Sequence, residues 1–227
     1  MKHNSLLLIT SLITALIFAA CTMPLPEPAE PAAEAVAVEE SDSEAEEPSG
    51  EPTSFAVDAT ASELIWIGSN IVGQEQTGTI DIAEGSLEFA GTTLTGGSVS
   101  IDMTTMSSIN LSGDTANNLI GHLMNEDFFE VDTWPTSMLV FKSAEATDVE
   151  AQYLVTADLT IKDVTDELTF ITDVIVDEGM LTATADIAFD RTDWGVIYGS
   201  GNFFDGLGDR VIQDEVIMQV TLVASSS

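Results

Sequence analysis

Apolar and polar residues alternate with a period of two through most of the chain from residue 55 onward, and this pattern constrains the fold more than any other feature. It is longest in residues 153–161 and 181–189, where apolar side chains stand at every second position. A strand with this alternation has one face against a core and the other toward water. About eight such segments predict an all-β chain of antiparallel strands that form a closed barrel or a sandwich. An eight-stranded barrel can hold one elongated apolar ligand.

Three segments depart from this alternation. Residues 115–124 place apolar side chains at helical intervals, which predicts a short helix with Asp114 as its N-cap. Residues 83–86 read Ala-Glu-Gly-Ser and are expected to form a turn between two strands. The glycine-rich residues 198–209 are expected to form a mobile hairpin loop at the barrel mouth, where two adjacent phenylalanines contact a ligand. This loop lacks the lysine of a phosphate-binding loop.

An apolar leader ends at the single cysteine of the chain, Cys21. Its short basic start, apolar centre and final small residues are typical of a secretory signal peptide, and it is too short for a stable membrane span. A cysteine at this point resembles the cleavage site of bacterial lipoproteins, where the thiol is acylated. We therefore expect a lipoprotein signal peptide at residues 1–20 and lipidation of Cys21. The alternative is an ordinary signal peptide with a chance cysteine.

The segment after the leader is rich in Pro, Ala, Glu and Ser and contains no aromatic residue. Such a segment buries too little apolar surface to fold, and its like charges extend it. We expect residues 21–54 to be the acylated cysteine followed by a disordered acidic tether, and residues 55–227 to be a barrel domain. This organisation predicts an extracytoplasmic protein, lipid-anchored in the bacterial cell envelope on its periplasmic or outer surface.

The charge of the chain is strongly negative, with 39 acidic and 5 basic residues and a net charge of −34. Such a surface repels phosphates, which argues against nucleic acid as a partner. Most of the acidic residues belong to the barrel domain, so the tether alone does not account for the charge. A salt-rich or divalent-rich habitat, in which screening weakens self-repulsion, would suit this composition.

Few residues in the chain have the pattern of a catalytic or metal site. His122 is the one histidine after the leader, so a zinc site is not expected, and there is no nucleophile elbow. Asp190 and Asp193 could do acid–base work, but Arg191 between them favours an ion-pair clamp. We expect neither catalytic residues nor a metal, and no cofactor apart from a bound lipid.

Six ordered stretches resemble the YceI-like family of polyisoprenoid-binding proteins, and the resemblance covers roughly residues 55–224, the whole region expected to fold. The stretch Gly121–Pro135, with its GHL and DFFEVD strings, is the most recognisable. The others are TGTIDIAEGSLEF, GGSVSIDMTTMSSI, ADLTIKDVTDELTF, FDRTDWGVIYGSG and GLGDRVIQDEV. The chain departs from the family pattern at Ala157 and Asp163, where glycine is usual, and at Asp166 and Glu167, where lysines are common.

The resemblance implies an extended, lipocalin-like, eight-stranded antiparallel β-barrel with a short helical insertion. Such barrels bind isoprenoid chains, including quinone tails and polyprenyl phosphates, without known catalysis, and a homodimer is one assembly that the resemblance suggests. Because the chain has few basic residues, a neutral quinone-like headgroup fits better than a diphosphate.

Under this hypothesis the protein carries or stores isoprenoid lipid, and large apolar side chains line a tunnel. The expected lining residues are Trp66, Phe89, Ile101, Met103, Leu119, Leu123, Phe128, Phe141, Phe170, Phe189 and Trp194. The candidate headgroup contacts are His122, Arg191 and Arg210. Two alternatives stay open at this point. One is a structural or stress-related envelope module whose barrel is filled by side chains, and the other is an envelope enzyme that acts on a lipid.

Overall fold

Ten antiparallel strands form one sheet in the computed structural model, which describes residues 50–226. A helix, α1 (Gly113–Met124), and three short 3₁₀ helices accompany them. The predicted signal peptide, Cys21 and nearly all of the expected tether lie outside the described residues. Among those described, no helix is long and apolar enough to cross a membrane. The strands are β1 (Pro52–Val57), β2 (Glu63–Asn70), β3 (Glu75–Thr79), β4 (Asp81–Ala90), β5 (Thr93–Asp102), β6 (Thr136–Ala146), β7 (Gln152–Ile161), β8 (Val164–Asp177), β9 (Met180–Asp190) and β10 (Ile212–Ser226).

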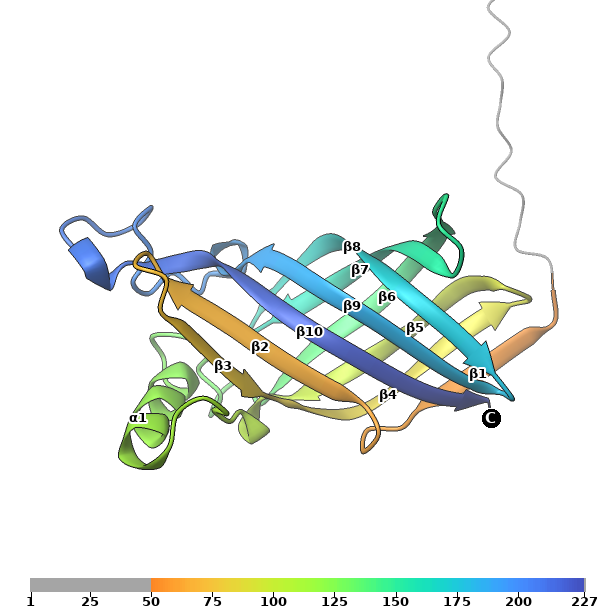
Figure 1. Cartoon of the computed structure of the whole chain (residues 1–227), viewed down its shortest axis with the longest axis horizontal. Helices are drawn as coiled ribbons and strands as arrows, with labels where there is room; N and C mark the ends of the chain where they lie inside the picture. The colour runs from red at the N-terminus through yellow and green to blue at the C-terminus, as the bar shows by residue number, and fades with distance from the viewer. Residues whose placement is uncertain (1–49, 227) are drawn as a thin grey trace, which may run out of the picture. The chain divides into compact units, whose positions relative to one another are not determined.

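The sheet closes into a barrel because β1 pairs with both β4 and β10 (Figure 1). The closed ring runs β1-β4-β5-β6-β7-β8-β9-β10, which confirms the eight-stranded antiparallel barrel. The two extra strands, β2 and β3, extend from the edge of β10. β1 and β2 both pair with β10, and only Ile80 separates β3 from β4. The extra pair therefore continues the barrel wall.

A polar corner joins β1 to β2. Asp58 accepts hydrogen bonds from the Thr60 hydroxyl at 2.7 Å and from the backbone N–H groups of Thr60 and Ala61. These bonds favour the carboxylate, so they lower the pKa of Asp58. The corner lets one long stretch of chain change from pairing with β4 to pairing with β3.

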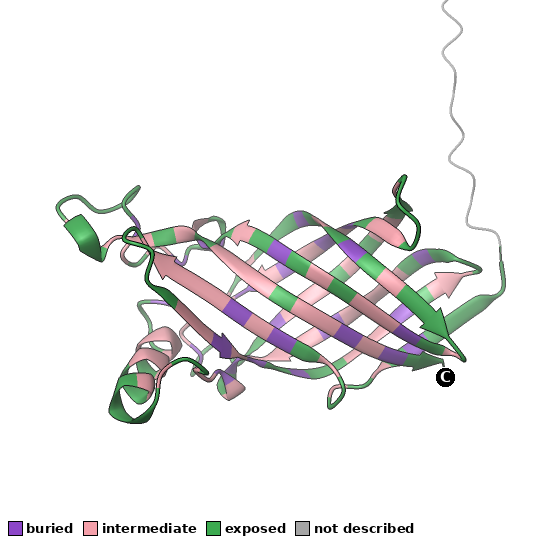
Figure 2. Ribbon diagram, viewed as in Figure 1, coloured by how far each residue is buried: buried purple, intermediate pink, exposed green. Residues whose placement is uncertain are grey.

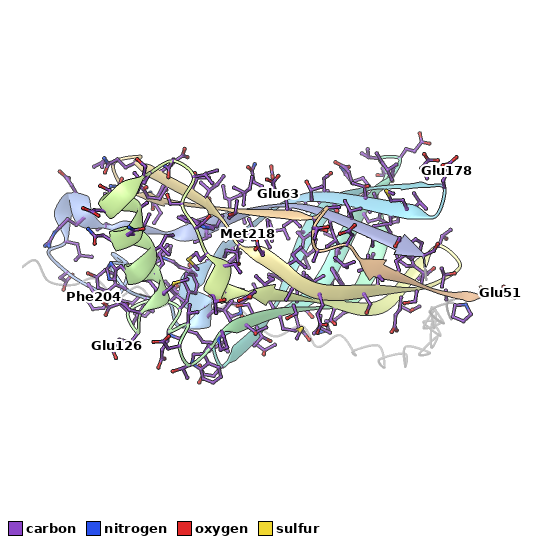
Figure 3. The ribbon with its side chains drawn as sticks, turned by 90° about the horizontal axis from the view of Figure 1, so that it is seen from below. Glu51, Glu63, Glu126, Glu178, Phe204 and Met218 are labelled. Carbon is purple, nitrogen blue, oxygen red and sulfur yellow. The ribbon has the colours of Figure 1, made fainter. Side chains whose placement is uncertain are left out.

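The barrel has two different ends. At the first, called the turn end, short turns follow β4 (Gly91–Thr92), β6 (147–151) and β8 (Glu178–Gly179). Glu178 and Gly179 both have positive φ, as a two-residue hairpin turn requires. At the other, called the helix end, lie α1 and the long loop before β10. Figure 3 shows Glu51 and Glu178 at the turn end, Glu126 and Phe204 at the helix end, and Met218 between them.

The connection from β5 to β6 carries η1 (Met103–Thr105) and α1, and it also covers a sheet edge. The backbone N–H groups of Ser107 and Ile109 donate to the carbonyl oxygens of Thr79 and Thr77, each at 2.9 Å. These bonds satisfy acceptors on β3, which would otherwise be an open edge.

The expected N-cap and one expected turn are wrong. Ser112, in an extended conformation, precedes the first residue of α1, so Asp114 lies inside the first turn of the helix. The expected turn at 83–86 lies within β4, where the pairing register with β5 shifts between Ile82 and Glu84. A Cβ on Gly85 would meet the carbonyl oxygen of Ser98 at 2.9 Å. This glycine permits a close approach of two strands at a bulge, and it does not mark a chain reversal.

Burial alternates along the strands as the period of two predicts (Figure 2). The inward side chains form three clusters. One, at the turn end, includes Phe55 and Leu181, and a second, toward the helix end, includes Phe128 and Trp194. The third, between α1 and the β2–β3 extension, includes Trp66 and Met106.

Gly78→Ala should destabilise the barrel, because Trp66 and the edge-covering segment close over this glycine. An added Cβ would lie 1.7 Å from the Ser107 carbonyl oxygen and 2.5 Å from the Trp66 ring. The expected loss is about 1–3 kcal/mol of unfolding free energy, the usual cost of overpacking, measured by urea denaturation. Gly68→Ala on neighbouring β2 is the control, because nothing lies within 4 Å of its added Cβ. Equal losses in both variants would contradict this account.

Candidate binding cavity inside the barrel

The barrel encloses an elongated cavity of about 450 Å³. Inward side chains from every strand except β3 line it, and the lining is almost wholly apolar. Its volume lies within the range of about 300–1,000 Å³ that is typical of pockets for small organic ligands. An eight-stranded barrel is just wide enough for its side chains either to fill the interior or to leave space for one small ligand. Here the side chains leave that space.

The alternation of the strands explains the apolar lining. On β8, Leu168, Phe170, Val174 and Val176 share the inward face with Thr172, and all five line the cavity. The Thr172 hydroxyl donates to the carbonyl oxygen of Thr184 at 3.0 Å, so this buried polar group is satisfied within the wall.

Most of the residues expected to line a tunnel do line the cavity. They are Trp66, Phe89, Ile101, Met103, Leu123, Phe128, Phe141, Phe170 and Phe189. Leu119 and Trp194 do not line it. Leu119, on α1, packs against the cluster that contains Trp66 and Met106. Trp194 is 2% exposed and donates from Nε1 to the carbonyl oxygen of Leu159 at 2.8 Å, and it is buried in the cluster that contains Phe128.

The expected list also missed many lining residues. They are mostly small or aliphatic, such as Ala183 and Ala185 on β9, and they include Tyr153 on β7. The alternation with a period of two indicates that these positions face inward, but the residues expected to line the tunnel were mainly aromatic or otherwise large. Small residues in the wall matter because they leave the space that a ligand would occupy.

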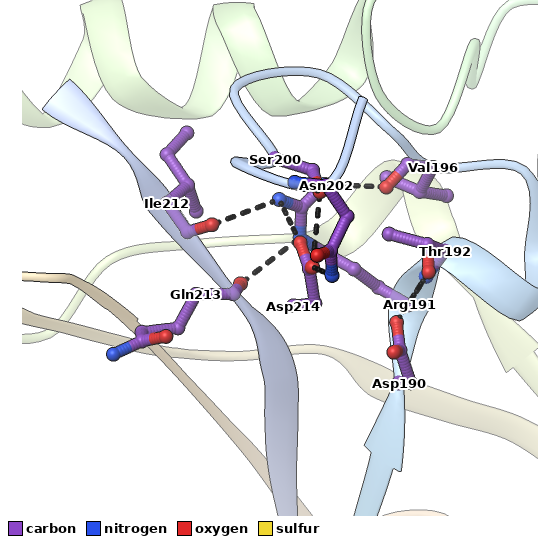
Figure 4. A network of polar contacts seen from close by, with 9 residues as sticks. All are labelled: Asp190, Arg191, Thr192, Val196, Ser200, Asn202, Ile212, Gln213 and Asp214. Carbon is purple, nitrogen blue, oxygen red and sulfur yellow. Dashed lines mark hydrogen bonds and ion pairs between the residues drawn. The ribbon is translucent and has the colours of Figure 1, made fainter. Parts of the chain in front are cut away.

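A polar network around Arg191, which lines the cavity, lies at its helix end (Figure 4). Arg191 is 3% exposed, and its Nη2 lies 3.2 Å from Asp214 Oδ1. The same guanidinium donates to the carbonyl oxygens of Gln213 and Ile212, at 3.1 and 3.3 Å, and to that of Val196. Arg191 therefore ties the end of β9 to the start of β10.

The ion-pair clamp expected of Arg191 exists, but its partner is not the one expected. Asp190 accepts from the backbone N–H of Thr192 at 2.8 Å and from its hydroxyl, so it caps the 3₁₀ helix η2 (Arg191–Trp194). The partner is Asp214, on the next strand of the sheet. Burial lowers the pKa of Arg191, and the nearby charge of Asp214 opposes this effect.

The same network holds the loop between η2 and β10. Asp214 Oδ2 accepts from the Ser200 hydroxyl at 2.9 Å and from Asn202 Nδ2 at 2.8 Å. Phe203 and Phe204 in this loop are exposed and do not line the cavity, so the expected ligand contact there is absent from the geometry.

Of the three candidate headgroup contacts, Arg191 alone lines the cavity. Four of its five N–H groups already have partners within the chain, which makes its role chiefly structural. His122 lies outside the lining, where its Nε2 is 3.1 Å from Asp127 Oδ2 and its ring contacts Phe128 and Tyr198 edge-on. Arg210 also lies outside the lining.

The part of the chain that the structure describes contains no group of three or more His, Cys, Asp or Glu side chains placed to hold a metal ion.

Lys142, on the outer wall, lies 2.8 Å from Glu167 and 3.1 Å from Asp158. These two acidic neighbours raise the pKa of Lys142.

Comparison with solved structures shows the same fold in other proteins. BcnA of Burkholderia cenocepacia is 22% identical, with a TM-score of 0.60, and the match covers 74% of this chain and 99% of that one. A structure described as a polyisoprenoid-binding domain from Saccharophagus degradans is 15% identical, with a TM-score of 0.58, over 76% of this chain and 98% of that one. A search of curated proteins finds no significant match. The YceI-like domain family matches residues 55–224, which contain the barrel except the outer ends of β1 and β10, and every residue that lines its cavity. The chain therefore belongs to the YceI-like family.

Proposed function

We propose that this protein binds isoprenoid lipids in the barrel cavity and carries or stores them in the cell envelope. The apolar cavity inside a closed barrel is the observation that carries the proposal. Membership of the YceI-like family supports it, as does the likeness to a domain described as polyisoprenoid-binding. The physical basis is hydrophobic burial, since each CH₂ group moved from water into the cavity gains about 0.8 kcal/mol.

The two alternatives fit the geometry less well. A filled structural barrel would have side chains where the cavity lies. A lipid-modifying enzyme would need reactive groups facing the ligand, but Asp190, Asp193 and His122 lie outside the lining. We therefore propose binding without catalysis.

We further propose that Cys21 is acylated and holds the barrel at a membrane. Stable anchoring by lipids requires more than one acyl chain, and a fully processed lipoprotein cysteine supplies this. A tether of about 30 residues, with a root-mean-square reach of about 30 Å, would let the barrel reorient near its lipid source. The support for this proposal is the leader sequence and the composition that follows it.

Partly filling the cavity should weaken lipid binding without unfolding the barrel. In Ala185→Trp the indole would project from β9 into the cavity, whereas in Thr184→Trp it would project outward from the adjacent position. Each full-length protein is extracted with organic solvent, and the bound prenyl lipid is quantified by mass spectrometry. We expect Ala185→Trp to retain roughly tenfold less lipid, equivalent to about 1.4 kcal/mol of binding free energy, and Thr184→Trp to resemble the native protein. Absence of prenyl lipid from the native protein would count against the proposed function.

Removing the anchor should lower loading in the cell without altering the barrel. Cys21→Ser should bind an added prenyl lipid as tightly as the native protein does after purification. It should nevertheless carry several-fold less lipid when isolated from cells, because the barrel is no longer held at its source. Equal loading of the two proteins in cells would show that Cys21 is not required for lipid uptake.

A further inference from the structure

The cavity reaches solvent at the turn end. Val176 occupies an inward position on β8 and lines the cavity, yet it is 59% exposed. Gly91 and Thr92, in the turn between β4 and β5, also line the cavity and are exposed. An inward side chain of a closed barrel can be exposed only where the barrel is open. These three residues therefore mark an opening, which we call the portal.

The helix end is closed by comparison. The inward side chains of Ile161, Arg191 and Phe128 are 7%, 3% and 5% exposed. Gln213 is the one exposed lining residue among those at this end, and Arg191 Nε holds its carbonyl oxygen at 3.1 Å. A long ligand would therefore enter through the portal and extend toward the helix end.

The rim of the portal is acidic. The Glu51 carbonyl oxygen accepts a hydrogen bond from the backbone N–H of Gly91 at 3.2 Å, which places Glu51 beside the portal. Asp177 and Glu178 directly follow Val176 and are exposed. Figure 3 shows Glu51 and Glu178 at this same end.

The basic side chains of the described domain lie elsewhere. Lys142 is paired with Asp158 and Glu167 on the outer wall, and Lys162 lies in the turn between β7 and β8, at the helix end. Arg191 and Arg210 belong to segments of the helix end. None of the cationic side chains within residues 50–226 lies beside these carboxylates, so the described residues make the potential at the portal negative.

We propose that isoprenoids enter this portal tail first, and that its acidic rim selects neutral headgroups over phosphorylated ones. This inference rests on the proposed function and adds the site of uptake and the class of headgroup. A phosphate that entered the apolar interior would lose its hydration without a partner. A phosphate that stayed at the rim would meet Glu51, Asp177 and Glu178. A neutral quinone or alcohol avoids both penalties, and two hydroxyl-bearing residues, Thr92 and Tyr153, are among those that line this end of the cavity.

The position of the portal can be tested by blocking it. Because Cys21 is the only cysteine, Cys21→Ser provides a full-length background for a single new thiol. Thr92→Cys places the thiol at the portal, and Val72→Cys, in the exposed β2–β3 turn at the helix end, is the matched control. Each protein is modified with a polyethylene-glycol maleimide, and loading of geranylgeraniol is followed by the change in intrinsic tryptophan fluorescence, to which Trp66 in the cavity wall contributes. We expect modification to slow loading roughly tenfold in Thr92→Cys and little in Val72→Cys. The reverse result, or no slowing in either protein, would overturn the position of the portal.

The charge selection can be tested with two probes that differ only at the head, geranylgeraniol and geranylgeranyl phosphate. At low salt we expect the native protein to bind the alcohol roughly tenfold more tightly, and added NaCl to narrow the difference through screening. The double variant Glu51→Lys/Glu178→Lys should reduce this difference in affinity severalfold. Glu63→Lys/Glu126→Lys changes the net charge equally, but at mid-barrel and at the helix end (Figure 3), and should have little effect.

The possible outcomes separate the two proposals. If both double variants reduced the affinity difference between the alcohol and the phosphate equally, the preference for the alcohol would depend on the total charge of the protein. That result would overturn the role of the rim. Equal or tighter binding of the phosphate by the native protein would overturn the selection while leaving lipid binding intact. Failure to bind either probe would instead count against the proposed function.

Discussion

Closure of the sheet by the pairing of β1 with β10 is the constraint on which the rest of the structure depends. The register joins Phe55 to Ser226 and Val57 to Ala224, so the first and last described strands complete one wall. A closed wall leaves no open edge in the ring and turns every inward position toward a shared interior. With small residues such as Ala183 and Ala185 among the larger ones, that interior is not filled, and an apolar cavity results.

The two ends of this barrel are built differently, and the difference gives the cavity a direction. At the helix end, the buried guanidinium of Arg191 pairs with the partly buried Asp214 and donates additional hydrogen bonds to three carbonyl oxygens. A buried charge is tolerated only when it is paired and hydrogen-bonded, and this one joins η2, the following loop and β10. The turn end has short hairpin turns, a lining residue open to solvent and acidic neighbours. A ligand with an apolar tail and a polar head would match this difference, with its tail toward the closed helix end and its head at the open turn end.

The energetics separate affinity from selectivity. For the proposed lipid ligand, burial of the tail would need no polar contact, so the apolar walls alone would supply affinity, which increases with the number of buried CH₂ groups. Discrimination among lipids with the same tail must then arise where the head stays, because the tails are identical. At the proposed portal, residues 50–226 place carboxylates and no cationic side chain. The departures from the family pattern at Asp166 and Glu167 extend the same acidity over the outer wall, where Glu167 pairs with Lys142.

The sequence by itself determined the strand-rich fold, the inward positions and the family, because alternation and local motifs are properties of neighbouring residues. The barrel was predicted, and most of the expected tunnel residues, from Trp66 to Phe189, do line the cavity. Only the tertiary structure decided which apolar residues line the cavity and which pack in neighbouring clusters without lining it, as Leu119 and Trp194 do. It also decided that Arg191 pairs with Asp214 and not with Asp190, and that residues 83–86 bulge within β4 instead of turning. These outcomes depend on contacts between distant segments, which no local pattern records. The open and closed ends of the cavity depend on the same long-range contacts.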